Sequence, residues 1–203
     1  MDPAAPSVSF FDAQFRRQVR QRDFELNPFE REALPHLRGD VLDAGCGLGN
    51  LALAAAERGC SVLALDASPA AIEHLRAVAA ARSLPLRAEQ ADLAGYAPPP
   101  AAFDAVVAIG LLMFFDCATA RGQLARLLAA VRPGGVAVVN VLVAGTTWLE
   151  PFGDGAHCLL PADELRRAFA GWTLRHDREQ AFDAAGGTVK RFVTVIAQRP
   201  RDG

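Results

Sequence analysis

Three aspartates and three closely spaced glycines are the residues best suited to bind a ligand. Asp43, Gly45, Gly47 and Gly49 share the stretch VLDAGCGLGN, in which the glycines follow a short apolar run. A glycine loop between a strand and a helix lets the backbone approach a ligand closely, and the helix N-terminus favours an anion. Asp66 ends the next apolar run, where a carboxylate can accept two hydrogen bonds from a ribose diol.

The charge of the first aspartate narrows the choice of ligand. Asp43 suits a cationic ammonium group and would repel a diphosphate, and the G-x-G-x-x-G fingerprint of dinucleotide folds fails here at its third glycine. Asp92 follows a third apolar run in EQADLAG, where its carboxylate or the neighbouring backbone can bind an adenine amine. A ligand with a ribose, an adenine and a positive amino-acid tail is S-adenosylmethionine rather than NAD. An NAD(P)-dependent oxidoreductase stays the alternative.

Alternating apolar runs and amphipathic segments must position these residues. We expect helices at 69–83 and 119–131, with another directly after the glycine loop, and strands at 41–44, 61–65, 86–90, 103–110 and 135–143. Strands and helices that alternate at this spacing predict an α/β fold with a doubly wound, mostly parallel, Rossmann-like sheet. A helix is expected at 161–171, and segments 172–180 and 188–198 read as an antiparallel C-terminal hairpin around DAAGG.

Five ordered motifs resemble those of class I S-adenosylmethionine-dependent methyltransferases. They are DAGCGLGN, ALDASP, QADL, FDAVVAIG and the RPGG before a strand, and they cover roughly residues 40–143. The resemblance implies a seven-stranded sheet whose last strand is antiparallel, with S-adenosyl-L-methionine as the cofactor. The expected cofactor-binding residues are Asp43, Gly45, Cys46, Gly47, Asn50, Asp66, Ala67, Ser68, Asp92, Leu93, Ile109 and Phe115.

The C-terminal part resembles the tellurite-resistance branch of that family. GLLMFFDCATARGQLARLLAAVRPGG, LPADELRRAFAGWTL and VKRFVTVIAQRP carry the similarity. It implies a small cytoplasmic enzyme that methylates tellurite and related oxyanions. The family's His-Arg pair before the final hairpin turn is absent from EQAFDAAGG, whereas Arg191 matches a family arginine. The expected acceptor is therefore a small molecule or an oxyanion.

Acceptor-side residues must come from loops that can reach the carboxyl ends of the strands. His157 lies in the glycine- and aromatic-rich segment AGTTWLEPFGDGAHCLL, and Arg191 could hold an anionic acceptor. Both are candidate catalytic residues, and each has a plain alternative as a surface side chain. Methyl transfer is in the first place a matter of positioning, so the absence of an obvious base does not argue against activity.

The first 38 residues form a separate segment in this prediction. Phe11, Phe15 and Val19 fall at helical spacing, with arginines on the opposite face. We expect either a solvated helix packed on the body or a lid over the cofactor. Residues 39–203 form the predicted S-adenosylmethionine-binding domain. A non-catalytic module that binds S-adenosylmethionine remains a third functional reading.

Composition limits the partners. The net charge is −2 and four cysteines are scattered along 203 residues, so we expect no nucleic-acid partner, no metal site, no disulfide framework and a reducing, cytoplasmic setting. The longest uncharged apolar run is shorter than the roughly 20 residues that span a bilayer, so we expect no membrane. The expected state is a monomer or homodimer.

Overall fold

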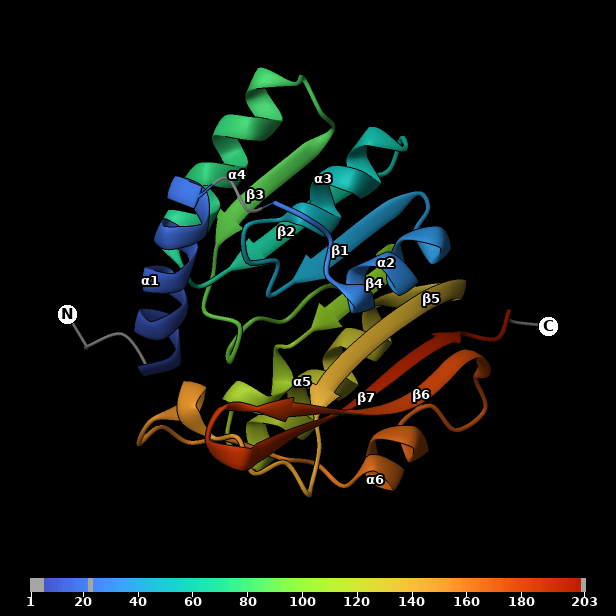
Figure 1. Ribbon diagram of the computed structural model, residues 1–203. Helices are drawn as coiled ribbons and strands as arrows, with labels where there is room; N and C mark the ends of the chain where they lie inside the picture. Colours follow the sequence, from blue (N-terminus) through green and yellow to red (C-terminus); the bar gives the residue numbers. More distant parts are fainter. Residues whose placement is uncertain (1–5, 22–23, 202–203) are drawn as a thin grey trace.

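The computed structural model describes residues 6–21 and 24–201 and contains one seven-stranded sheet (Figure 1). Its strand order is β3-β2-β1-β4-β5-β7-β6. The five strands from β3 to β5 pair in parallel, while β7 is antiparallel to both β5 and β6. The strands are β1 (Asp40–Ala44), β2 (Ser61–Asp66), β3 (Leu86–Gln90), β4 (Phe103–Ile109), β5 (Val131–Leu142), β6 (Thr173–Ala184) and β7 (Thr188–Gln198).

Two helical layers cover the sheet and enclose two apolar cores. One core lies between the sheet and α2 (Pro28–Ala33), α3 (Asn50–Glu57) and α4 (Pro69–Ala81). The other lies between the sheet and α5 (Cys117–Ala130) and α6 (Ala162–Arg167). The near-continuous burial of β4 and β5 follows from having helices on both faces. The predicted doubly wound α/β sheet with its antiparallel C-terminal hairpin is therefore confirmed.

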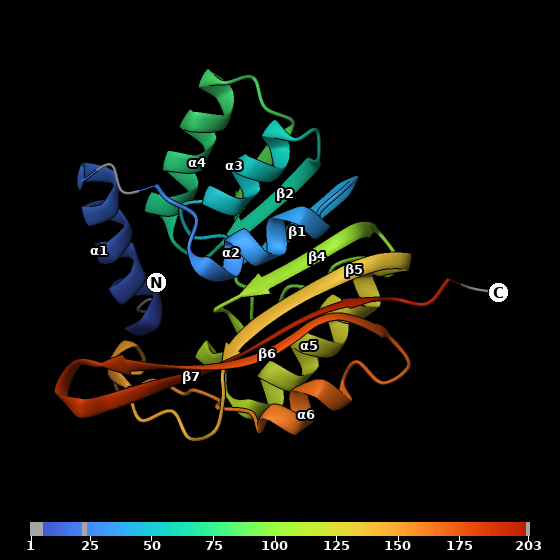
Figure 2. The ribbon, with the colours of Figure 1, turned by 45° about the vertical axis from the view of Figure 1, so that its right-hand side comes forward.

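The first helix, α1 (Pro6–Gln21), stands apart from these layers. Figures 1 and 2 show it beside α4, at the end of the sheet where β1 and β2 terminate. Its aromatic residues are partly buried, and Arg16, Arg17 and Arg20 are exposed, as the helical spacing predicts. The helix therefore lies over the edge of the sheet at which ligands bind in open α/β folds.

Two local predictions differ from the structure. The helix predicted over 161–171 is only six residues long, Ala162–Arg167, and continues as turns. The RPGG turn lies within β5, where the pairing with β4 shifts between Phe103 and Ala105. Arg132 in that turn bonds the carboxylates of Asp40 and Asp104, each at 2.9 Å, and this holds the irregular stretch against the sheet.

A disulfide joins Cys117, at the start of α5, to Cys158 in the segment after β5. The expectation that the cysteines do not pair is therefore wrong for two of the four, while Cys46 and Cys60 are buried and free. Sequence spacing did not reveal the pair because 41 residues separate its members. The folded backbone brings them together, with the Cys158 N–H donating to the Met113 carbonyl just before α5. The prediction of a reducing compartment rested on unpaired cysteines, and the disulfide removes that argument.

Candidate functional site

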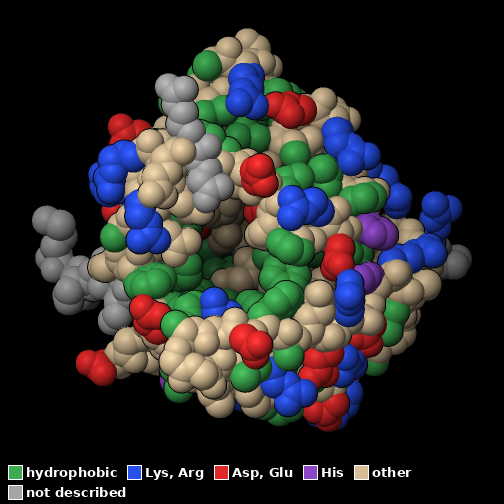
Figure 3. All heavy atoms as spheres, in the orientation of Figure 1, with side chains coloured by type: hydrophobic (Ala, Val, Ile, Leu, Met, Phe, Trp, Pro, Cys, Tyr) green, Lys and Arg blue, Asp and Glu red, His purple; other side chains and the backbone are tan. Residues whose placement is uncertain are grey.

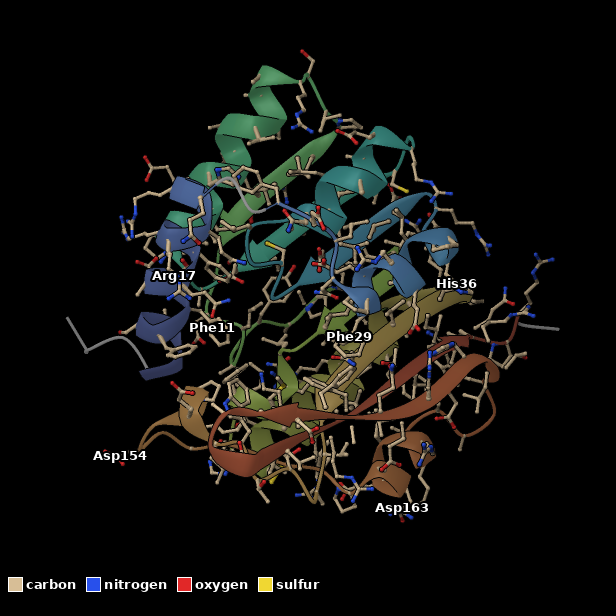
Figure 4. All side chains as sticks on the ribbon, viewed as in Figure 1. Phe11, Arg17, Phe29, His36, Asp154 and Asp163 are labelled. Atoms are coloured by element: carbon tan, nitrogen blue, oxygen red, sulfur yellow. A yellow bond between two sulfur atoms is a disulfide. The ribbon has the colours of Figure 1, made fainter. Side chains whose placement is uncertain are left out.

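A cavity of about 900 Å³ opens at the C-terminal ends of the parallel strands. Figure 3 shows this face of the molecule hollowed at its centre, with hydrophobic side chains around the opening. In Figure 4, Phe11 from α1 and Phe29 from α2 lie on different sides of it, while Arg17 is on the outer side of α1. The volume is near the upper end of the range for small-molecule sites, roughly 300–1,000 Å³.

The glycine loop between β1 and α3 forms one wall of this cavity. Gly45, Gly47 and Gly49 all have positive φ, between 54° and 77°, a region that side chains rarely tolerate. A Cβ on Gly49 would lie 2.5 Å from a Leu75 methyl, and one on Gly45 would lie 3.2 Å from Leu111. One side of the loop therefore packs tightly against Leu75 and Leu111, and its other side faces the cavity.

Asp66, at the end of β2, is the best anchored acid of the site. Its two carboxylate oxygens accept from the backbone N–H of Gly47 and of Ser68, each at 2.8 Å. Burial raises the pKa of Asp66, and these backbone hydrogen bonds oppose the rise. Each oxygen keeps a lone pair, so the carboxylate can still accept the two hydroxyl groups of a ribose.

Asp43 is buried at the end of β1, and none of the residues that the structure describes forms a salt bridge with it. It is 5% exposed, and burial together with Glu30 and Asp66 raises its pKa to about 8. Glu30 is held in place by the Asn27–Glu30 capping box at the start of α2, and burial raises its pKa as well. Three acids that favour protonation at close range create a place where a ligand's ammonium group would be bound strongly.

The far end of the same wall is shaped for a flat, polar ring. Asp92 is exposed and accepts from the Ala94 N–H at 3.0 Å, while Leu93 beside it is buried. The free carboxylate oxygen and the apolar Leu93 side chain suit the amine and the face of an adenine. The Cys46 thiol faces the acids, and burial, followed by the charges of Asp43 and Asp66, raises its pKa well above the usual value, so it remains a thiol.

The structure brings all twelve predicted cofactor residues to this one cavity. Its lining includes Asp43, Gly45, Cys46, Gly47, Asn50, Asp66, Ala67, Ser68, Asp92, Leu93, Ile109 and Phe115. We call this wall the cofactor end. The acids around Asp43, the Asp66 carboxylate, and Asp92 with Leu93 would suit, in that order, the ammonium group, the ribose and the adenine of S-adenosylmethionine. The individual contacts remain predictions.

Helix α1 covers the cofactor end directly. Asp12 accepts from the Ser68 hydroxyl at 2.6 Å and from the Ala70 N–H at 3.2 Å, at the start of α4. The Ser68 hydrogen bond is the main reason that the pKa of Asp12 is lowered. Phe15 packs on Gly47, and Phe11 meets Phe114 edge-on with ring centroids 5.1 Å apart. The helix thus contacts the start of α4, the glycine loop and Phe114.

The opposite wall, which we call the acceptor end, is formed by Asn140, Leu142, Trp148, Lys190 and Phe192. Aromatic side chains from several elements adjoin it, including Phe29, whose ring lies 4.9 Å from that of Phe192. Lys190 Nζ lies 3.6 Å above the centre of the Trp148 ring. This wall is therefore apolar, with one cation at its rim.

Neither predicted catalytic residue lines the cavity in the structure. The exposed His157 ring stacks on the ring of Phe152, with centroids 4.6 Å apart. Arg191 donates to the Glu179 carboxylate at 2.7 Å. Alternate side chains of a strand point to opposite faces, so Lys190 and Phe192 face the cavity and Arg191 faces away. The acceptor-side roles expected for His157 and Arg191 are therefore corrected.

Sequence reasoning missed Glu30, Asn140 and Lys190 as cavity residues. The motif Asn27-Pro-Phe-Glu30 is typical of a capping box, so the helix start was visible, but its place beside Asp43 was not. Lys190 is the only lysine of the chain, a compositional feature that marks it out without saying where it lies. Asn140 is a lone polar residue in the apolar run GVAVVNVLV.

Known proteins similar to the chain are methyltransferases in the main. A methyltransferase domain family matches residues 41–135. The chain is 32% identical over 167 residues to Hemagglutinin 1 of Eikenella corrodens, which covers 79% of this chain and 54% of that protein. It is 32% identical over 151 residues to the malonyl-acyl-carrier-protein O-methyltransferase of Serratia marcescens, which covers 70% of this chain and 55% of the relative. The chain thus spans about half the length of these relatives.

The fold is similar to that of solved structures. The crystal structure of TehB from Haemophilus influenzae superposes with a TM-score of 0.71 at 17% identity, covering 90% of this chain and 65% of that one. At this identity the likeness concerns the fold alone. The domain match begins at β1 and ends inside β5, so it spans the glycine loop, Asp66 and Asp92. The chain therefore contains a methyltransferase domain, and its sequence and fold resemble those of class I S-adenosylmethionine-dependent methyltransferases.

Proposed function

We propose that the protein transfers a methyl group from S-adenosylmethionine to a small, largely apolar acceptor. One observation carries this proposal: a single cavity has an acidic end that suits an adenosyl and ammonium ligand, and an aromatic end that does not. A dinucleotide would place its phosphates near Asp43 and Glu30, buried acids that offer a diphosphate no positive charge and repel it once they ionise. The related O-methyltransferase acts, by its name, on a malonyl group carried by a protein; here the cavity of about 900 Å³ has the size of a small-molecule site, which favours a free small molecule.

The cofactor supplies a reactive methyl group on a positively charged sulfur, a good leaving group. The protein's part is to position donor and acceptor, which can lower the barrier by roughly 7–11 kcal/mol when the alignment is good. Asp66 would hold the ribose and Asp43 the ammonium group, which would limit the freedom of the bound cofactor. The acceptor end would then position the nucleophile for attack on the methyl group.

One further acid of the cavity lining, Asp116, is already engaged in the fold. Asp116 accepts hydrogen bonds from two backbone N–H groups at the start of α5 and from the Thr119 hydroxyl. The Thr119 side chain is the main reason that the pKa of Asp116 is lowered, so this carboxylate is a poor base. We therefore propose an acceptor that brings a lone pair or an already ionised atom to the site.

Calorimetry and a product assay test the proposal together. S-adenosylmethionine and S-adenosylhomocysteine should bind, and NAD should not. A panel of phenols, thiols, carboxylates, tellurite and selenite is then screened by release of S-adenosylhomocysteine. Turnover with one of them excludes a non-catalytic binding module. Binding of NAD without binding of S-adenosylmethionine would reject the proposal in favour of an oxidoreductase.

The oxyanion acceptor implied by the tellurite-resistance resemblance is the finer form of this proposal. Among the described lining residues, Lys190 is the one basic side chain that could hold such an anion. A compact oxyanion would leave the aromatic wall unfilled, so we rank an organic acceptor first. The described part of the chain has no helix long and apolar enough to cross a membrane.

A further inference from the structure

Charge is distributed very unevenly around the cavity. The acidic side chains that line it are Glu25, Glu30, Asp43, Asp66, Asp92 and Asp116, and the one basic side chain on the described lining is Lys190. An anionic group on an acceptor would therefore be repelled from most of the wall and attracted to one point. The position of Lys190 thus fixes the orientation of an acidic acceptor.

Lys190 is placed for a ligand rather than for an ion pair. No carboxylate among the described residues forms a salt bridge with it, although its neighbour Arg191 pairs with Glu179. Its ammonium group instead rests on Trp148, a cation–π contact that leaves its hydrogen-bond donors free. The backbone N–H groups of Thr147 and Trp148 donate to the Val189 carbonyl, which fixes Trp148 beside β7.

An unused polar group lies at the inner end of the same wall. The Asn140 side chain is 1% exposed, and its Nδ2 donates to the Thr194 hydroxyl at 2.9 Å. Its Oδ1 has no hydrogen-bond partner in the described part of the chain. A buried acceptor without a partner costs free energy, and since Asn140 lines the cavity, a donor on a bound molecule can satisfy it.

The register of β7 gives the distance between these two points. Asn140 pairs with Thr194 and Leu142 with Phe192, and Lys190 follows on the same face of β7. Four residues of strand extend about 13 Å. Asn140 also accepts the Gly110 N–H at its carbonyl, next to the loop that borders the glycine wall. Asn140 therefore lies at the deep end, near the cofactor, and Lys190 at the outer end.

Resting on the proposed function, we infer that the acceptor is an elongated, apolar or aromatic molecule with an acidic group at one end. Lys190 binds the acidic group and Trp148 stacks beside it. Phe192 and Leu142 cover the body of the molecule. The end that receives the methyl group lies toward Asn140, whose position along the strands is about 13 Å from that of Lys190, and Asn140 accepts a hydrogen bond from it.

Two fluorescent probes test this inference without any methyl transfer. 8-Anilino-1-naphthalenesulfonate and N-phenyl-1-naphthylamine share one ring system, and only the first has an acidic group. Both are titrated into the protein with and without S-adenosylhomocysteine. The variants are Lys190→Met, Lys190→Gln, Lys190→Arg and, as a matched control that faces away from the cavity, Arg191→Met.

We expect Lys190→Met and Lys190→Gln to weaken sulfonate binding about tenfold, equivalent to about 1.4 kcal/mol, and to change binding of the neutral probe less than twofold. Lys190→Arg and Arg191→Met should retain sulfonate binding. Equal loss of both probes, or loss of neither, would overturn the inference. Calorimetry with S-adenosylhomocysteine is read separately: a wild-type protein that does not bind it rejects the proposed function, whereas the probe comparison still decides the role of Lys190.

Discussion

The two ends of the cavity are built in different ways. The cofactor end binds through backbone geometry and buried acids: a glycine loop with positive φ, and Asp66 held by two backbone N–H groups. The acceptor end is formed by side chains from distant segments, such as Trp148 and Lys190, which meet because backbone hydrogen bonds join the segment after β5 to Val189 of β7. Backbone-built sites impose a local sequence pattern, and sites built from scattered side chains do not.

Asp66→Ala gives the largest effect and tests the cofactor end. The change removes a carboxylate that orders the glycine loop and would hold the ribose. Hydrogen bonds to charged groups contribute roughly 1.5–3 kcal/mol each, so we expect cofactor affinity to fall at least about a hundredfold. Calorimetry with S-adenosylhomocysteine measures it. Asp66→Asn keeps the shape and should lose less, and unchanged affinity in Asp66→Ala would show that the ribose binds elsewhere.

Loss of the disulfide should lower the thermal stability of the protein far more than its affinity for the cofactor. Closing a loop of 41 residues stabilises a protein by about 4 kcal/mol in the chain-entropy relation. We expect Cys117→Ser with Cys158→Ser to lower the melting temperature, with cofactor affinity changed less than about threefold. Cys60→Ser is the matched control at a buried free thiol. A double variant that melts like the wild type would mean that the bond contributes nothing to stability.

Removal of α1 tests whether it acts as a lid. A variant that lacks residues 1–21 loses the Asp12 contacts with Ser68 and Ala70 and the packing of Phe15 on Gly47. We expect cofactor affinity and turnover to fall about tenfold, the effect of one or two such hydrogen bonds, with little loss of thermal stability. Asp12→Ala should show part of the loss. Full activity in the truncated protein would leave α1 as a packed surface helix.

The ionisation of Asp43 predicts a pH dependence. Its pKa in the folded protein is about 8, above the ordinary value of 3.8. Between about pH 4 and pH 8 the folded protein therefore holds a proton that the unfolded chain has lost, and the stability of the ligand-free protein falls as pH rises. Asp43→Asn should remove this slope. Chemical denaturation at pH 5 and pH 8 measures it, and an equal slope in both proteins would contradict the prediction.

The ionisation of Asp43 also predicts that cofactor binding releases a proton. A cationic ammonium group beside Asp43 favours its ionised form, so cofactor binding at pH 6.5 should release close to one proton. Calorimetry in buffers with different ionisation enthalpies measures that proton. Asp43→Asn should bind without it, and proton release from that variant would assign the proton to another group, such as Glu30.

His157→Ala should have the smallest effect. It tests whether His157 contributes to the acceptor end. The side chain is exposed and stacks on the outer side of Phe152, and surface substitutions usually change stability by less than about 0.5 kcal/mol. We expect cofactor affinity and turnover within about twofold of the wild type. A loss of turnover with unchanged cofactor affinity would return His157 to the acceptor site.

Sequence patterns predicted the sheet well, and the twelve expected cofactor residues all line one cavity, because strand burial, turn glycines and strand-terminal acids are local. The ends of α6 and the start of β5 were less predictable. At the start of β5, the contacts of Arg132 with Asp40 and Asp104 determine the conformation of the irregular RPGG stretch. The residues of the acceptor end could not be predicted from the sequence, for a geometric reason. Lys190 and Arg191 are adjacent in sequence, and only the pairing of β7 decides which of them faces the cavity.

This alternation along β7 has an evolutionary consequence. The turn at 185–187 joins β6 to β7 without any role in the cavity wall. One inserted or deleted residue there, if β7 slipped with it, would exchange the faces of a flexible ammonium and a rigid guanidinium. Substrate preference in such a scaffold can therefore diverge through the length of a surface turn, while every residue that recognises the methyl donor stays unchanged.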